Sequence, residues 1–247
     1  MPPWCKVHAA SVWIAAQGAG SVNKQEVRNR IEELGIIPSI RVSTTEDAVL
    51  AAEAVARGGI PIIEVALTEP EAVQIVYHLA QRLPKVMVGA GSVHDVETAR
   101  LCLEAGARFL SSDGLDPDTV KFAVHQDVVV IPGVLTPTDV IAAWKLHPDF
   151  VKIVPCGHIG GDAYLKDLKT MFPHVPMIAA GGVNQRTAFN FITAGAAALG
   201  IGADLIPREA IRRRQPDQIV ELARRFLIAV NSARDRWVTP WKSAGGA

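Results

Sequence analysis

The chain has 247 residues, and 25 Lys and Arg balance 25 Asp and Glu, so its formal net charge is zero. It lacks the basic excess that binding to nucleic acid or to an anionic membrane usually requires. Hydrophobic residues make up 49% of the chain and charged residues 20%, a composition that excludes disorder and a collagen-like fibre. The length suits one large α/β domain.

Three cysteines, Cys5, Cys102 and Cys156, form neither a C-x-x-C pair nor a disulfide framework, so we expect a protein of the reducing cytoplasm. The longest apolar runs fall short of the roughly 20 residues that span a bilayer, and no membrane segment is expected. Residues 8–19 imitate a signal peptide only weakly, because His8 interrupts the apolar run. We therefore interpret residues 1–22 as an N-terminal extension.

In chain order, an amphipathic helix over residues 23–33 precedes short apolar runs that alternate with stretches of helical periodicity. The runs predict strands at 36–42, 62–66, 85–89, 109–112, 128–132, 150–154, 176–180 and 197–202. The stretches between and after them predict helices at 45–57, 70–82, 95–105, 117–126, 138–146, 162–171, 186–194 and 216–233. Ser43 and Glu46 have the spacing of a capping box at the first of these helices.

The strands are continuous runs of Val, Ile and Ala, which is typical of parallel strands covered on both faces. Eight strand-helix units predict an α/β protein with a single (β/α)₈ TIM barrel and an additional N-terminal helix. We place the barrel at residues 23–235 and a C-terminal tail at 236–247. An open doubly wound sheet is the main competitor, but residues 89–94 lack the third glycine of a dinucleotide-binding turn.

Lys152 is the strongest candidate for chemistry, because it lies in the otherwise apolar strand 150–154. Burial disfavours a charged ammonium and so favours a free, nucleophilic amine. Attack of that amine on a ketone gives an imine, which draws electrons from a neighbouring C–C bond. The structural alternative is a lysine that extends outward from the barrel end or is ion-paired inside it.

Two further polar residues lie within or at the end of predicted strands, and barrels of this class carry their active sites where the strands end. Glu64 follows two β-branched residues and needs a partner, either as an ion pair with Lys152 or as a proton shuttle. Arg41 ends the first strand and could bind a substrate carboxylate or form a salt bridge at the barrel rim.

Glycine-rich turns follow the last two strands, at residues 180–183 and 200–203. Barrels commonly hold phosphate at this position through backbone N–H groups, although tight strand-to-helix geometry without a ligand would also require glycine. The seven histidines form no metal-binding pair, so no metal or other cofactor is expected.

Five motifs in this order make the chain similar to the family of 2-keto-3-deoxy-6-phosphogluconate (KDPG) aldolases and 4-hydroxy-2-oxoglutarate (KHG) aldolases. They are IIEVALTEPEA around Glu64, GAGSV at residues 89–93, IPGVLTPTD at 131–139, VKIVP at 151–155 and AAGGVN at 179–184. The resemblance runs from about residue 36 to residue 206.

The resemblance implies a class I aldolase that releases pyruvate and an aldehyde from a 2-keto acid, without metal and as a homotrimer. Lys152 would form the Schiff base and Glu64 would act as general acid and base. Arg41 and Ser92 would hold the pyruvyl end of the substrate, while Thr68 and Asp113 would be further substrate contacts. The family's phosphate turns correspond to Gly181, Gly182, Gly202 and Ala203.

Four positions depart from the family's usual pattern. Asp113 stands where Ser-Pro is common, Ala180 and Ala203 replace a frequent Thr and Ser, and Gly157 replaces a frequent Glu. These changes leave the expected catalytic pair intact and concern the distal end of the substrate.

Two other functions remain open on the sequence. One is a phosphate-binding barrel isomerase or synthase that needs no imine, and the other is a sugar-phosphate-binding barrel that has lost turnover. Lys152 favours the aldolase over the first alternative.

Overall fold

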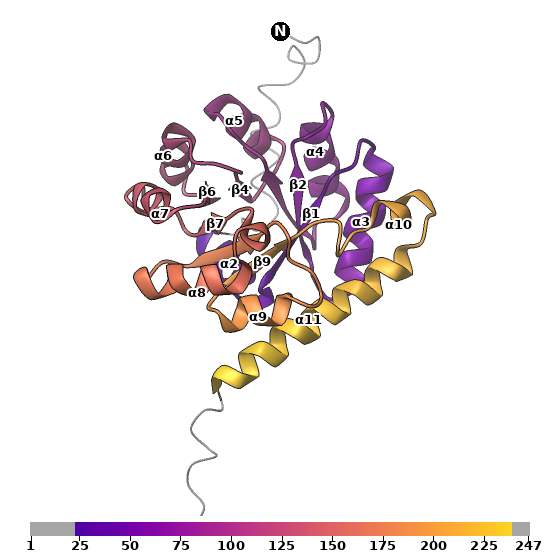
Figure 1. Ribbon diagram of the computed structural model, residues 1–247. Coiled ribbons are helices and arrows are strands. Elements are labelled where there is room, and N and C mark those ends of the chain that lie inside the picture. Colours follow the sequence, from indigo (N-terminus) through magenta and orange to yellow (C-terminus); the bar gives the residue numbers. More distant parts are fainter. Residues whose placement is uncertain (1–22, 239–247) are drawn as a thin grey trace, which may run out of the picture.

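The computed structural model describes residues 23–238. Its strands form a single sheet in the order β5-β4-β3-β2-β1-β9-β8-β7-β6, with every observed pairing parallel. Helices surround this sheet, which curls into a nearly closed barrel (Figure 1). The (β/α)₈ barrel predicted from the sequence is confirmed, and the N-terminal extension at 1–22 lies outside the described residues.

The elements alternate along the chain. The strands are β1 (Ile36–Ile40), β2 (Ile62–Ala66), β3 (Met87–Gly91), β4 (Phe109–Ser111), β5 (Val129–Ile131), β6 (Gly133–Val134), β7 (Val151–Ile153), β8 (Met177–Ala180) and β9 (Ala198–Ile201). The helices are α2 (Lys24–Leu34), α3 (Thr45–Arg57), α4 (Ala72–Arg82), α5 (Val96–Glu104), α6 (Pro117–His125), α7 (Pro137–Trp144), η2 (Cys156–His158), α8 (Gly161–Met171), α9 (Ala188–Thr193), α10 (Arg208–Arg212) and α11 (Pro216–Val238).

The barrel closes through one strand that is divided at a proline. β5 pairs with β4 and β6 pairs with β7, and only Pro132 separates β5 from β6 in the chain. Proline has no N–H to donate, but its carbonyl still accepts a hydrogen bond from the backbone N–H of Lys152 at 2.8 Å. The two short strands are therefore successive halves of one barrel strand, which changes partner at Pro132.

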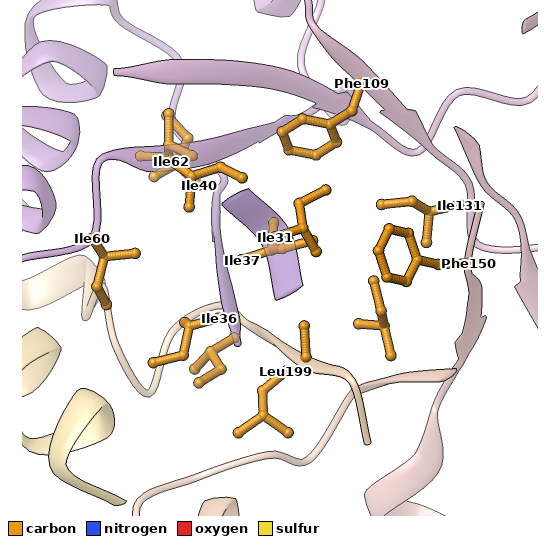
Figure 2. Packing of buried hydrophobic residues seen from close by; sticks show 14 of the residues in the cluster. Ile31, Ile36, Ile37, Ile40, Ile60, Ile62, Phe109, Ile131, Phe150 and Leu199 are labelled. Atoms are coloured by element: carbon orange, nitrogen blue, oxygen red, sulfur yellow. The ribbon is translucent and has the colours of Figure 1, made fainter. Parts of the chain in front are cut away.

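Helix α2 covers the amino-terminal end of the barrel. Asn23 and Glu26 form a capping box at its start, and Gly35 ends it with a φ of 65°. Ile31 is fully buried, and Figure 2 shows it near the middle of a group that includes Phe109, Ile131, Phe150 and Leu199. The additional N-terminal helix thus closes the bottom of the core.

Two local expectations need correction. β3 begins at Met87 and not at residue 85, because the N–H of Val86 bonds to the carbonyl of Leu83 and closes a turn there. The N-cap of α3 is Thr44 and not Ser43: the Thr44 hydroxyl accepts from the N–H of Asp47 at 3.2 Å. The helix therefore has a hydroxyl N-cap as predicted, but the residue that provides it is one position later in the chain.

The chain after β9 contains one helix more than the sequence predicts. The short helix α10 precedes α11, and α11 runs along α3 and α9 on the outside of the barrel (Figure 1). It continues to Val238, past the barrel boundary expected at residue 235. Within residues 23–238, every helix is too short or too polar to cross a lipid bilayer.

Candidate active site

A cavity of about 220 Å³ lies inside the carboxyl-terminal part of the barrel. It collects eight of the ten residues that the sequence indicates as site residues. These are Arg41, Glu64, Asp113, Lys152, Gly181, Gly182, Gly202 and Ala203. Ser92 and Thr68 do not line it.

Lys152 and Glu64 lie on the cavity wall and are joined by a serine. Both are buried, with 7% and 8% of their surface exposed. Lys152 Nζ donates to Ser111 Oγ at 3.3 Å, and Ser111 Oγ donates to Glu64 Oε2 at 2.5 Å. Sequence analysis missed Ser111, although it is a polar residue inside a predicted strand, as Glu64 and Lys152 are.

Two glycines in β3 make room for the side chains of Glu64 and Phe109. A Cβ at Gly91 would collide with the carboxyl group of Glu64, and one at Gly89 would collide with the ring of Phe109. The register pairs Glu64 with Gly89 and Ala66 with Gly91, so both glycines lie beside the end of β2. The glycine-rich GAGSV segment is therefore mostly strand, and its glycines serve close packing.

The carboxylate of Asp113 contacts Lys152 directly. Asp113 Oδ1 lies 3.2 Å from Lys152 Nζ, while Oδ2 accepts a hydrogen bond from Ser92 Oγ at 2.6 Å and lies 3.6 Å from His94 Nε2. Partial burial acts to raise the pKa of Asp113, but the charge of Lys152 and the hydrogen bond from Ser92 outweigh it, so the pKa lies below its usual value.

The structure gives Ser92 and Thr68 surroundings different from the predicted ones. Ser92 has a φ of 57° and directs its hydroxyl to Asp113. Thr68 is exposed, and its backbone N–H bonds to the carbonyl of Ala66. The predicted contact of Ser92 with the pyruvyl end of a substrate, and that of Thr68 with the substrate, stay predictions.

The glycine turn after β8 approaches η2 closely. Gly181 and Gly182 adopt φ values of 75° and 84°, in the left-handed region that favours glycine. The N–H of Gly157 donates to the carbonyl of Gly181 at 2.7 Å, and a Cβ at Gly157 would lie 2.8 Å from that same oxygen. A glycine at 157 thus permits a contact that a larger side chain would push apart.

Arg41 lies beside the second glycine turn. A Cβ added at Gly202 would be 3.2 Å from Arg41 Nη1. Among residues 23–238, Arg41 forms no salt bridge and no side-chain hydrogen bond, so its guanidinium is available to an anion. The rim salt bridge considered from the sequence is not formed within this range.

The two turns also offer backbone donors to the cavity. In the described part of the chain, no protein acceptor pairs with the N–H groups of Gly181, Gly182, Gly202 or Ala203. Left-handed glycines in succession orient such groups toward a common point, which suits an anion. Ala180 and Ala203 add no hydroxyl to this region, and Asp204 also lines the cavity.

A larger groove, of about 790 Å³, lies at the ends of α8, α9 and α11. Two of its cations have protein partners: Lys169 Nζ donates to the carbonyls of Pro173 and Val175, and Arg234 donates to those of Glu32 and Glu33. Burial lowers the pKa of both Lys169 and Arg234. These contacts are structural, and we place the chemistry in the smaller cavity.

Comparisons with known proteins identify the family. Residues 27–222 match the family model described as KDPG and KHG aldolase. A (β/α)₈ barrel with a buried lysine and a nearby carboxylate is the architecture expected of a Schiff-base enzyme of this class. The chain belongs to the KDPG and KHG aldolase family, so the resemblance found in the sequence is confirmed.

Individual relatives are similar in sequence over most of the chain. A 2-dehydro-3-deoxy-phosphogluconate aldolase of Treponema pallidum is 27% identical over 80% of this chain and 94% of its own length. A KHG/KDPG aldolase of Escherichia coli is 29% identical over 76% of this chain and 89% of its own.

A solved structure of the KDPG aldolase from Legionella pneumophila holds pyruvate as a covalent carbinolamine. It is 28% identical to this chain, covers 80% of it and 96% of its own length, and superposes with a TM-score of 0.74.

Proposed function

We propose that the protein is a class I aldolase, a lyase that cleaves a 4-hydroxy-2-keto acid into pyruvate and an aldehyde. The observation that carries this proposal is the buried row formed by Glu64, Ser111 and Lys152 on one cavity wall. Family membership and the covalent pyruvate adduct of the Legionella relative support it.

The row supplies the parts of a retro-aldol reaction. Lys152 attacks the keto carbon, and loss of water leaves a protonated imine. Glu64 then removes the proton of the C4 hydroxyl, the C3–C4 bond breaks as the aldehyde forms, and its electrons neutralise the imine as an enamine. Glu64 returns a proton to C3, and water releases pyruvate and the free lysine.

The far end of the cavity suits an anionic or strongly polar group on the substrate. The N–H groups of the two glycine turns, at Gly181, Gly182, Gly202 and Ala203, would bind its oxygens. Arg41 lines the same cavity and would bind the carboxylate at the pyruvyl end, as the family resemblance implies. A phosphate, as in a 2-keto-3-deoxy-6-phosphogluconate-like substrate, would fit this donor set. A 4-hydroxy-2-oxoglutarate-like substrate would present a carboxylate to it.

The alternatives have less support. A barrel isomerase or synthase without imine chemistry would have no need for a buried lysine in the cavity wall. A non-catalytic sugar-phosphate-binding barrel would not require the hydrogen-bonded link between Lys152 and Glu64.

The test is pyruvate release from synthetic 4-hydroxy-2-keto acids, with and without a terminal phosphate, followed through a coupled dehydrogenase. Lys152→Ala should abolish release. Glu64→Gln should retain substrate binding and lose about 10²–10⁴ in kcat, because an amide keeps the shape but cannot carry the proton. No release from any substrate, or turnover by the lysine variant, would contradict the proposal.

We also propose that the protein acts in the cytoplasm as a homotrimer. The cytoplasmic location rests on the cysteine content, and the homotrimer rests on the family resemblance. Light scattering after size-exclusion chromatography tests the second, and a mass of one or two chains would refute it.

A further inference from the structure

We propose that Asp113 is a second acid–base residue of the site, which serves imine formation and hydrolysis on Lys152 while Glu64 serves C–C cleavage. The inference rests on the proposed aldolase function and assigns its proton transfers to two different carboxylates. Asp113 touches the reacting nitrogen, whereas Glu64 reaches it only through Ser111.

The contacts place the two carboxylates at the two ends of one hydrogen-bonded chain that passes through the lysine nitrogen. That chain runs from Glu64 through Ser111 to Lys152, and from Lys152 to Asp113. Glu64 is 8% exposed, whereas the side chain of Asp113 is 44% exposed. One end of the chain is therefore buried and the other meets solvent.

Asp113 is held firmly in this position. The hydroxyl of Ser112 donates to the carbonyl of Gly114 at 2.6 Å, and the N–H of Ser112 donates to the carbonyl of Ile131 at 3.1 Å. Gly133 packs so closely on the backbone of Asp113 that a Cβ there would collide with it. A loop fixed on both sides keeps the carboxylate on the lysine.

The two oxygens of Asp113 face different side chains, and Oδ1 is the one that faces the reacting nitrogen. Oδ1 faces Lys152, while Oδ2 receives the hydroxyl of Ser92 and lies 3.6 Å from His94 Nε2. The side chain of His94 is 60% exposed. With both oxygens engaged by the protein, Asp113 is better placed to act on Lys152 than on a substrate hydroxyl.

The proton balance of imine formation fits a single carboxylate. Lys152 begins as the ammonium and passes one proton to Asp113, and the resulting amine attacks the keto carbon while the carbonyl oxygen gains a proton from nitrogen. Asp113 returns its proton to that hydroxyl, which leaves as water. The nitrogen keeps one hydrogen and the positive charge, and Asp113 is again the carboxylate beside it.

The experiment separates the two carboxylates by the step that each one serves. Rapid mixing with pyruvate and a borohydride quench gives the rate of imine formation, and loss of deuterium from C3 of deuterated pyruvate reports the later proton transfer at carbon. Asp113→Asn should slow imine formation by about 100-fold or more. Glu64→Gln should form the imine within a few-fold of the wild-type rate but lose the exchange.

Controls exclude a structural effect. Asp118→Asn removes an exposed carboxylate that pairs with Lys121 outside the cavity and should leave both rates unchanged. Asp113→Glu keeps the carboxylate and should restore part of the imine rate. Asp113→Ala should reproduce the defect of Asp113→Asn, with cooperative unfolding checked for each variant.

The outcomes distinguish this inference from the function on which it rests. Imine formation at the wild-type rate in Asp113→Asn would overturn the role of Asp113 and leave the aldolase intact. A change confined to the KM of hydroxylated substrates would also overturn it, in favour of a substrate contact. No adduct on the wild-type protein would remove the aldolase proposal, and this inference would fall with it.

Discussion

Ser111 links the two residues on which the proposed chemistry depends, although its side chain has no chemistry of its own in the reaction. Its hydroxyl accepts from Lys152 and donates to Glu64, so one rotamer satisfies both. A carboxylate buried without such a donor would lose hydration that nothing replaces. Ser111 therefore acts as a positioning residue for the pair.

We expect Ser111→Ala to lower kcat by about 10- to 100-fold, the effect of losing one hydrogen bond to a charged group. KM should change little, because neither lysine nor glutamate is removed. Steady-state kinetics on the best substrate measure this, with Ser111→Thr as a variant that keeps the hydroxyl. Loss of KM alone, with kcat preserved, would place Ser111 in substrate binding.

At the scale of elements, the turn after β8 and the short helix η2 form one unit. The N–H of Gly157 donates to the carbonyl of Gly181, and Gly181 lines the cavity. The departure at residue 157 from the family's usual Glu thus coincides with a contact that a side chain would disturb. The glycines shape the distal end of the cavity together.

Gly182→Ala should weaken binding at this end, because the residue has a φ of 84° and its new Cβ would lie 3.0 Å from the Cα of Gly157. A left-handed alanine costs about 1–2 kcal/mol, so the turn should shift to relieve the strain and carry its N–H donors away from the substrate. Loss of about 1.4 kcal/mol of binding energy in this way would raise KM roughly tenfold. The rate of imine formation with pyruvate should stay the same, because pyruvate has no distal group. An equal loss for pyruvate and for the full substrate would contradict this division of the cavity.

At the scale of the whole molecule, the core continues from α2 at the bottom of the barrel to the residues around the site. Cys102 and Cys156 are fully buried in it, and burial raises the pKa of each thiol to about 12. The native state therefore keeps both thiols protonated at a pH where an unfolded chain would ionise them. This difference lowers the stability of the native state at alkaline pH.

We predict that the free energy of unfolding falls as the pH rises from about 9 toward 12, by up to about 1.4 kcal/mol per pH unit for each thiol. The sign follows because the unfolded chain binds fewer protons than the native protein in this range. Urea denaturation over pH measures the slope. The double variant Cys102→Ala with Cys156→Ala, which keeps every other titrating group, should show a shallower one, and identical slopes would refute the prediction.

Sequence patterns predicted the barrel because each strand is a continuous apolar run, and they found Lys152 and Glu64 because charge is rare in such runs. They missed the division at Pro132, since it depends on which strands become neighbours. Ser111 and the contact of Asp113 with Lys152 depend on the same cross-barrel proximity. Arg41 was found, but its place beside Gly202 follows from the closure of β1 onto β9.

Reduction of the protein with borohydride in the presence of pyruvate, followed by peptide mass mapping, tests the central claim most directly. The buried position of Lys152 in β7, beside Ser111 and Asp113, predicts a three-carbon adduct on this lysine and none in Lys152→Ala. An adduct on another lysine, or no adduct under conditions that trap a known class I aldolase, would contradict the account.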